Sequence, residues 1–190
     1  MSSSLTDHTS TAATDDLVAA LAGLAPDSPV AALRAFRGDA TRYTQGSHDS
    51  LFSDDVVDLT LRERLYAAWY AALLSRSEQI AHAYCERLLA LEPAAGPDAE
   101  TGAHATSALL DAIAQHRTAR DVTADPRLAA ILVHTEALVL QPAATGKPAL
   151  SALQSAGLTT RAIVALAQLV AFVTYQVRVV AALRALEARA

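Results

Sequence analysis

The chain has 190 residues, 52% of them hydrophobic, which is enough to build the core of one folded domain. Its formal net charge is −5, with 20 acidic residues against 15 basic ones. Because no basic stripe is present, the composition argues against nucleic acid as a partner.

Helical spacing of apolar residues begins near Leu17. Residues 1–15 consist mainly of Ser, Thr, Ala and Asp, so we predict a disordered tail there and a single domain over residues 16–190. Short helices are predicted over residues 17–24 and from Pro29 to about Phe36. Residues 38–55 are rich in Gly, Ser and Asp, which predicts a loop.

Two capping-box patterns follow, Thr60-x-x-Glu63 and Ser75-x-x-Glu78, and each predicts the start of a helix. A continuous helix from Glu63 to Ser75 would separate these residues by about 18 Å. A chain reversal near residues 74–77 would instead make a hairpin of two helices, in which residues after the turn travel back toward Glu63.

The rest of the chain also reads as helical, because no useful period-2 alternation appears. Four further helices are predicted, over residues 98–116, from the Asp125-Pro126 cap to before Pro142, over residues 147–156 with Gly157 as the stop, and from Thr159 or Thr160 to about Glu187. The sequence therefore predicts an all-α fold with a motif-bearing half at about 40–92 and a second half at about 98–188.

The last predicted helix is apolar almost all round, which places it at the centre of the fold or at a subunit contact. Gln168, Gln176 and Arg178 interrupt its apolar run, which stays below the roughly 18 residues of a membrane span. We therefore predict no membrane association. The first Lys or Arg is Arg34, so no secretory signal is expected and a cytoplasmic location is predicted.

Four polar residues stand out by their spacing: Glu63, Ser75, Glu78 and His82 form E-x11-S-x2-E-x3-H. The pattern resembles the E-x11-C-x2-C-x3-H active site of the alkylhydroperoxidase-D (AhpD) and carboxymuconolactone decarboxylase family. The resemblance implies an AhpD-like helical domain. It also implies that Glu63 and His82 correspond to the glutamate and histidine that help to deprotonate a cysteine in that family.

Ser75 and Glu78 stand where the family has its two cysteines. A carboxylate cannot replace a thiolate in peroxide reduction, so the dithiol cycle is expected to be absent. Residues 45–52 and 173–178 also resemble segments of the family. In the second segment Tyr175 and Arg178 match the family pattern, whereas both asparagines of that pattern are replaced. The resemblance spans roughly residues 40–188 and points to the peroxidase-related subgroup. It implies a homo-oligomer, as a dimer, trimer or hexamer.

Three functions remain open from the sequence. The leading hypothesis is acid–base chemistry by Glu63 and His82 on a small organic acid or lactone, because histidine carries protons near neutral pH. The second is a non-catalytic small-molecule-binding or assembly protein on the same scaffold. The third is a one-cysteine peroxidase that uses Cys85. Because Cys85 is the only cysteine in the sequence, an intrachain disulfide is excluded.

Each site residue also has a structural interpretation. Glu63 and Glu78 can serve as capping-box partners, and Cys85 can be a small core residue. Glu78, His82 and Glu86 lie four residues apart, so they could offer a facial ligand set to a metal ion. No second-shell pattern supports such a site, and we predict neither a metal nor another cofactor.

Overall fold

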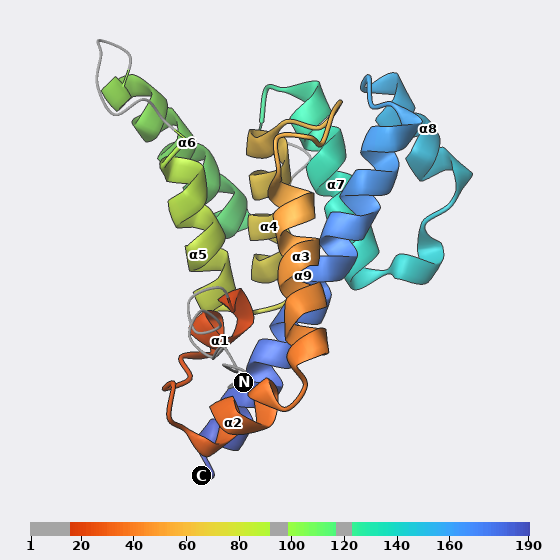
Figure 1. The fold of residues 1–190 in the computed structure, drawn as a ribbon. Coiled ribbons are helices and arrows are strands. Elements are labelled where there is room, and N and C mark those ends of the chain that lie inside the picture. Colours follow the sequence, from red (N-terminus) through yellow and green to blue (C-terminus); the bar gives the residue numbers. More distant parts are fainter. Residues whose placement is uncertain (1–15, 92–98, 117–122) are drawn as a thin grey trace, which may run out of the picture. The chain divides into compact units, whose positions relative to one another are not determined.

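The computed structural model describes residues 16–91, 99–116 and 123–190, so the predicted tail at residues 1–15 lies outside the described part. The described residues form helices and contain no strand, which confirms the all-α prediction (Figure 1). The elements are α1 (Leu17–Ala22), α2 (Pro29–Ala35), α3 (Gly38–Phe52), α4 (Leu61–Leu74), α5 (Glu78–Leu89), α6 (Ala99–His116), α7 (Pro126–Leu140), the short 3-10 helix η1 (Pro142–Ala144), α8 (Lys147–Ser155) and α9 (Thr160–Glu187).

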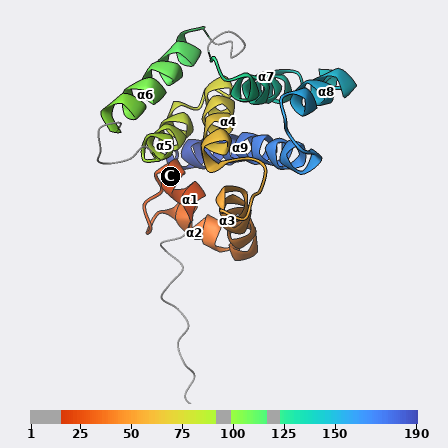
Figure 2. The same cartoon turned by 90° about the horizontal axis from the view of Figure 1, so that it is seen from above.

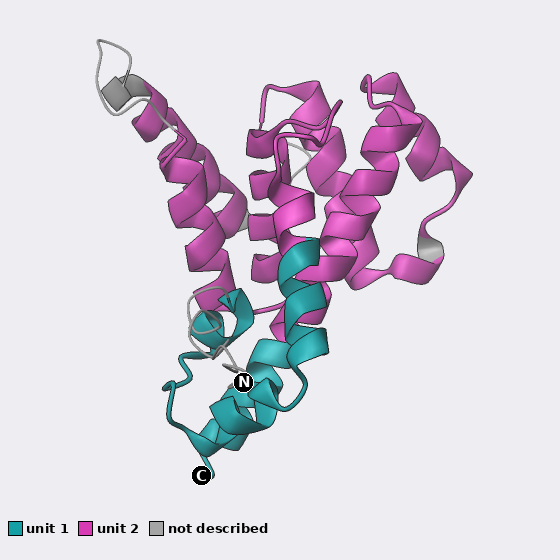
Figure 3. Cartoon of the chain, viewed as in Figure 1, with its two compact units in different colours: residues 1–47, 179–190 teal, residues 48–178 magenta. Residues whose placement is uncertain are grey.

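The chain divides into two compact units (Figure 3). Unit 1 comprises residues 1–47 and 179–190, and unit 2 comprises residues 48–178. Helices α3 and α9 each contribute residues to both units. All the residues singled out above for their chemistry belong to unit 2.

In unit 1, the side chain of Asp16 organises the first two helices. Its Oδ1 accepts hydrogen bonds from the backbone N–H groups of Val18 and Ala19, both at 3.1 Å, and so caps α1. The same carboxylate pairs with Arg34 of α2, whose Nη2 donates to Oδ1 at 2.7 Å. Helix α1 ends at Gly23, which has a φ of +69° that glycine adopts at little cost. Local capping therefore sets the bounds of both short helices.

Helix α4 is the centre of unit 2. In two perpendicular views it lies between α5 and α7 (Figures 1 and 2). Every residue from Glu63 to Ala72 is buried. Several of these side chains are alanines, which allow neighbouring helices to approach closely. A helix with two packed neighbours needs apolar residues on more than one face.

The turn between α4 and α5 confirms the predicted hairpin but corrects the predicted cap. Arg76 has a left-handed φ of +58°, and α5 begins two residues later at Glu78 and packs along α4. Ser75 does not start α5. It is the C-cap of α4, and its Oγ donates to the carbonyl of Ala71 at 2.7 Å. The N-cap of α5 is Ser77, which makes no side-chain capping bond.

The predicted loop at residues 38–55 was wrong for most of its length, because residues 38–52 form α3. Its hydroxyl groups donate back to carbonyls one turn earlier, as Ser47 does to Tyr43 at 2.8 Å. At its C-terminal end, the buried guanidinium of Arg64 donates to the carbonyls of Leu51 at 2.7 Å and Ser53 at 2.9 Å. Contacts with distant residues thus stabilise a helix whose composition resembles a loop.

The later helix boundaries follow the predicted caps. Asp125 Oδ1 accepts a hydrogen bond from the backbone of Arg127 at 2.8 Å, at the start of α7. Thr159 Oγ1 accepts one from Ala162 at 3.2 Å, at the start of α9. Gly157 closes the turn after α8 with a φ of +85°. The predicted long apolar helix at the C-terminal end of the chain is thus present.

By length and composition α9 could cross a membrane, and 39% of its most apolar window is buried inside the protein. Within unit 2 its buried face comprises Ala162, Ile163, Leu166, Leu169, Val170, Phe172, Val173 and Gln176. Its exposed residues include Val164 and Tyr175. Within unit 2 the helix therefore has one face in the protein core and one exposed face.

Candidate functional site

Glu63 is a buried carboxylate whose two oxygens both have partners. Its Oε2 accepts hydrogen bonds from the backbone N–H of Thr60 at 2.7 Å and from the Thr60 hydroxyl at 3.0 Å. The Glu63 N–H donates to Thr60 Oγ1 at 3.2 Å, which completes the predicted capping box of α4. Its Oε1 accepts from Nε of Arg127 at 2.5 Å. The carboxylate is thus fully engaged in a helix cap and an ion pair.

Arg127 links Glu63 to two other segments of unit 2. Its Nη1 donates to the carbonyl of Gly157 at 2.7 Å, and its Nη2 donates to the carbonyl of Asp58 at 2.5 Å. Asp58, with a φ of +65°, in turn accepts from the Thr159 hydroxyl at 3.0 Å. We call Glu63, Arg127, Asp58, Gly157 and Thr159 the arginine clasp. It joins the start of α4, the start of α7 and the turns that precede α4 and α9.

His82 lies in a different environment from Glu63. Its side chain is 73% exposed, and its polar partner is Glu86, with Nδ1 and Oε2 3.6 Å apart. The partners of Glu63 are instead Thr60 and Arg127. Although the hairpin forms as predicted, neither side chain bonds to the other in the described part of the chain. The Glu63–His82 pair therefore remains a prediction.

The other residues of the spacing motif lie along α5 and its preceding turn. Ser75 bonds to Ala71, and Glu78 is an exposed residue in the first turn of α5. Cys85 is partly buried, and burial raises the pKa of its thiol, with smaller contributions from Asp111 and Glu86. A raised pKa leaves less thiolate at neutral pH, so this environment does not activate the cysteine.

Within residues 16–91, 99–116 and 123–190, no three His, Cys, Asp or Glu side chains come together in a way that could hold a metal ion. This finding covers Glu78, His82 and Glu86, so it counts against the facial ligand set considered from their spacing.

A polar and aromatic cluster that the spacing motif did not indicate lies between α3, α5 and α9. His48 Nδ1 is 3.0 Å from Asp49 Oδ1, and its Nε2 is 3.0 Å from Nη1 of Arg87. The Arg87 guanidinium also lies over the ring of Phe52, 4.5 Å from its centroid. The His48 side chain is only 14% exposed, whereas Asp49 is 61% exposed. We call His48, Asp49, Phe52 and Arg87 the imidazole cluster.

The imidazole cluster continues into the core through Tyr84. The Tyr84 ring stacks on Phe52 with centroids 5.4 Å apart, and its hydroxyl donates to Gln176 Oε1 at 2.9 Å. Gln176 is fully buried, and its Nε2 has no hydrogen-bond partner among the residues that the structure describes. The two segments that carried the wider resemblance, residues 45–52 and 173–178, thus meet around α5. That shared resemblance was the one sequence signal that could have indicated this cluster.

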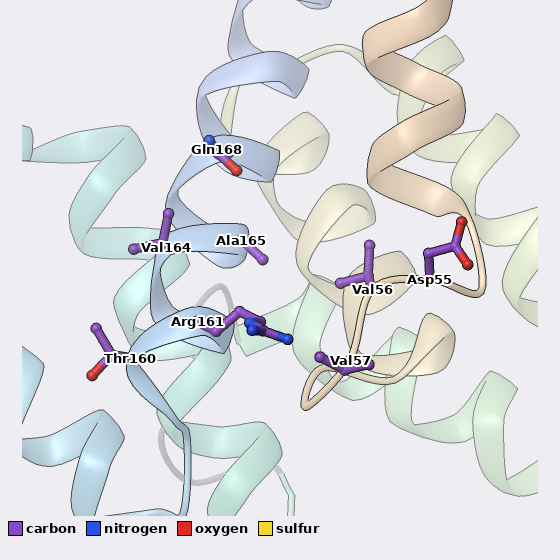
Figure 4. A pocket seen from close by; sticks show the side chains of 8 residues that line it. All are labelled: Asp55, Val56, Val57, Thr160, Arg161, Val164, Ala165 and Gln168. Atoms are coloured by element: carbon purple, nitrogen blue, oxygen red, sulfur yellow. The ribbon is translucent and has the colours of Figure 1, made fainter.

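An open groove of about 510 Å³ lies beside the arginine clasp. Figure 4 shows residues of the loop before α4 on one side and residues of α9 on the other. Its lining residues are Asp55, Val56, Val57, Thr160, Arg161, Val164, Ala165 and Gln168. The clasp residues Asp58 and Thr159 directly follow and precede these two walls in the sequence and are hydrogen-bonded to each other. The clasp therefore fixes the spacing of the groove walls.

In comparisons with known proteins, no family model matches the chain, and no curated protein matches it. The resemblance to the AhpD and carboxymuconolactone decarboxylase family therefore remains a prediction based on residue spacing.

Proposed function

We propose that this chain is a small-molecule-binding protein without acid–base chemistry at Glu63, and that the groove beside α9 takes an amphipathic monocarboxylate. The observation that carries this proposal is the lining of the groove. Val56, Val57 and Val164 offer apolar surface, and Arg161 supplies a cation that has no hydrogen-bond or ion-pair partner among the described residues. Apolar walls with a small number of polar or charged groups are typical of small-ligand sites.

The composition of the groove also limits the ligand. The guanidinium of Arg161 favours a carboxylate, because arginine pairs with carboxylates through charge-assisted hydrogen bonds. Asp55 lines the same groove, so a second carboxylate on the ligand would be repelled. We therefore infer that a monocarboxylate with an apolar tail binds better than a dicarboxylate of similar length.

The proposal assigns Glu63 a structural role. Both oxygens of its carboxylate already accept hydrogen bonds, so a proton transfer would require it to leave its cap and Arg127. His82 is mostly exposed and does not line the groove. Glu63 supports binding in the groove because it holds Arg127, which bonds the turns next to both groove walls, and neither of its own oxygens is left free to act as a base.

A second candidate function is assembly with further copies of the chain. It is favoured by the exposed residues of α9 in unit 2, which recur at alternating steps of three and four: Arg161, Val164, Gln168, Ala171, Tyr175 and Arg178. This spacing places the six residues on one face of the helix, which a second copy of the chain could cover. Light scattering after size exclusion tests this proposal. A monomer across a hundredfold range of concentration would contradict it.

Ligand binding is tested by NMR titration with a series of saturated monocarboxylates and the dicarboxylates of equal length. A ligand of about 13 heavy atoms at about −0.3 kcal/mol per atom gives a dissociation constant on the order of 1 mM, which NMR detects. We expect shifts at Val57, Val164 and Ala165, and weaker binding of each dicarboxylate.

The matched variants are Arg161→Gln, in the groove, and Arg178→Gln, on the same helix outside it. Loss of the exposed cation at position 161 should weaken binding about fivefold, equivalent to about 1 kcal/mol. Arg178→Gln should leave binding unchanged. Equal effects of both substitutions would contradict a specific site.

Turnover of a lactone or acid that His82→Ala abolishes would overturn the proposal in favour of acid–base catalysis.

A further inference from the structure

We propose that His48 and Arg87 form a proton-operated latch that holds the C-terminal end of α3 on α5 only while the imidazole is neutral. The latch is independent of the groove and of any ligand bound there. It rests on the hydrogen-bond geometry of His48, both of whose ring nitrogens have a partner.

The partners of His48 determine which nitrogen carries the proton. Arginine has only donors, so Nε2 of His48 must be the acceptor of the 3.0 Å bond from Arg87. In the neutral ring the proton then lies on Nδ1, which donates to Asp49 Oδ1 at 3.0 Å. Asp49, His48 and Arg87 thus form one directional chain of hydrogen bonds from a guanidinium to a carboxylate.

Protonation of His48 breaks one end of this chain. An imidazolium carries hydrogen on both nitrogens, so Nε2 can no longer accept from Arg87. Two cations would then face each other at 3.0 Å in a site that is largely shielded from water. Either the Arg87 guanidinium leaves the Phe52 ring or the end of α3 moves away from α5.

The groups that face His48 decide the direction of its titration. On α3 these groups are Asp49 and the ring of Phe52. On α5 they are Arg87, which bonds His48, and Tyr84, which stacks on Phe52. On α9 the facing residue is Phe172, whose ring centroid lies 6.2 Å from that of His48. Burial lowers the pKa of His48, Asp49 opposes this, and Arg87 lowers it further. The net direction is below the ordinary value of 6.5.

The sign of the pH dependence follows from that direction. The unfolded chain binds a proton at His48 near its ordinary pKa of 6.5, whereas the folded chain does so only at lower pH. The contribution of the latch to stability is therefore complete above pH 6.5 and is lost as the pH falls through the lowered folded pKa. Each unit of lowering corresponds to about a tenfold loss in the folding equilibrium constant.

NMR titration of the imidazole Cε1–H signals of the full chain measures this directly. We expect the His48 signal to titrate below 6.5 in the wild type. In Arg87→Met, which removes the cation but keeps an apolar stem over Phe52, it should titrate at higher pH. His134, which is also buried and also has a lowered pKa, serves as an internal reference and should not move in Arg87→Met.

The structural consequence is tested with His48→Gln, whose amide oxygen can still accept from Arg87 but does not titrate. Between pH 7.5 and 5 this variant should lose less stability than the wild type and show smaller amide shifts at the end of α3. His134→Gln removes the other buried imidazole and should keep those α3 shifts. A His48 that titrates at or above 6.5 in the wild type, or α3 shifts that persist in His48→Gln, would overturn the latch.

Discussion

In the described part of unit 2, Arg127 and Arg87 are both partly buried, and their partners differ in kind. Arg127 faces the carboxylate of Glu63 and two backbone carbonyls. Arg87 faces the imidazole of His48 and the ring of Phe52. The first cation is paired directly with a carboxylate, whereas the second bonds a neutral imidazole and lies over a ring, with Asp49 as a nearby negative charge. A similarly placed arginine therefore makes a permanent ion pair in one case and, by our proposal, a pH-dependent contact in the other.

Removal of Glu63 should produce the largest loss of stability. Glu63→Ala removes the capping-box carboxylate and leaves Arg127, which is 28% exposed, without its counter-charge. Breaking a buried ion pair on one side costs about 3 kcal/mol, and the lost cap adds to it. Urea unfolding of wild type and variant measures the difference.

Glu78→Ala is the matched control for this prediction, because Glu78 is also a glutamate in the first turn of a helix but is exposed and does not complete a capping box. Its loss should cost below about 0.5 kcal/mol. Similar losses in both variants would contradict the clasp. A double-mutant cycle with Arg127→Met then isolates the pair, because removing both partners should cost less than the sum of the single changes.

Arg87→Met should have an intermediate effect at pH 7.5. The variant loses a hydrogen bond and a cation–π contact, together worth about 1–2 kcal/mol, while the methionine stem keeps part of the packing. Burial lowers the pKa of Arg87 and so opposes its charge, which makes the net loss smaller than at the clasp. Thermal unfolding checks the order. A loss greater than that of Glu63→Ala would reverse the comparison.

The two arginine sites also differ in how far the sequence predicts them. Thr60 and Glu63 are three residues apart, and their capping box follows from that spacing and is present. The same spacing at Ser75 and Glu78 predicted a second box that is absent, because Ser75 caps the end of α4 instead. The local sequence pattern thus predicts the capping role of Glu63. It does not predict the ion pair with Arg127, which is 64 positions away and comes close to Glu63 only because α7 packs on α4.

The imidazole cluster could not be predicted from local sequence patterns either, for a different reason. Residues 38–52 have a loop-like composition, and their helix is stabilised by Arg64 at its end and by the contacts of His48 and Phe52 with α5. None of these partners is near in sequence. The all-α class and most helix bounds were predictable because caps and apolar spacing are local. The site was not, because its contacts join residues that only the tertiary fold brings together.

His82→Ala should have the smallest effect on the free energy of unfolding. It tests whether the face of α5 that carries His82 is exposed in solution. The His82 side chain is 73% exposed and contacts Glu86 of the same helix, so its loss should change stability by less than about 0.5 kcal/mol. His48→Ala, which removes a buried ring, should cost more, so the two histidine variants form a matched pair. A loss above about 1 kcal/mol for His82→Ala would mean that this face of α5 is covered in solution, because an exposed side chain has too few contacts to account for it. If that loss disappears on dilution, the covering surface belongs to another copy of the chain, and assembly rather than groove binding becomes the better account of the protein.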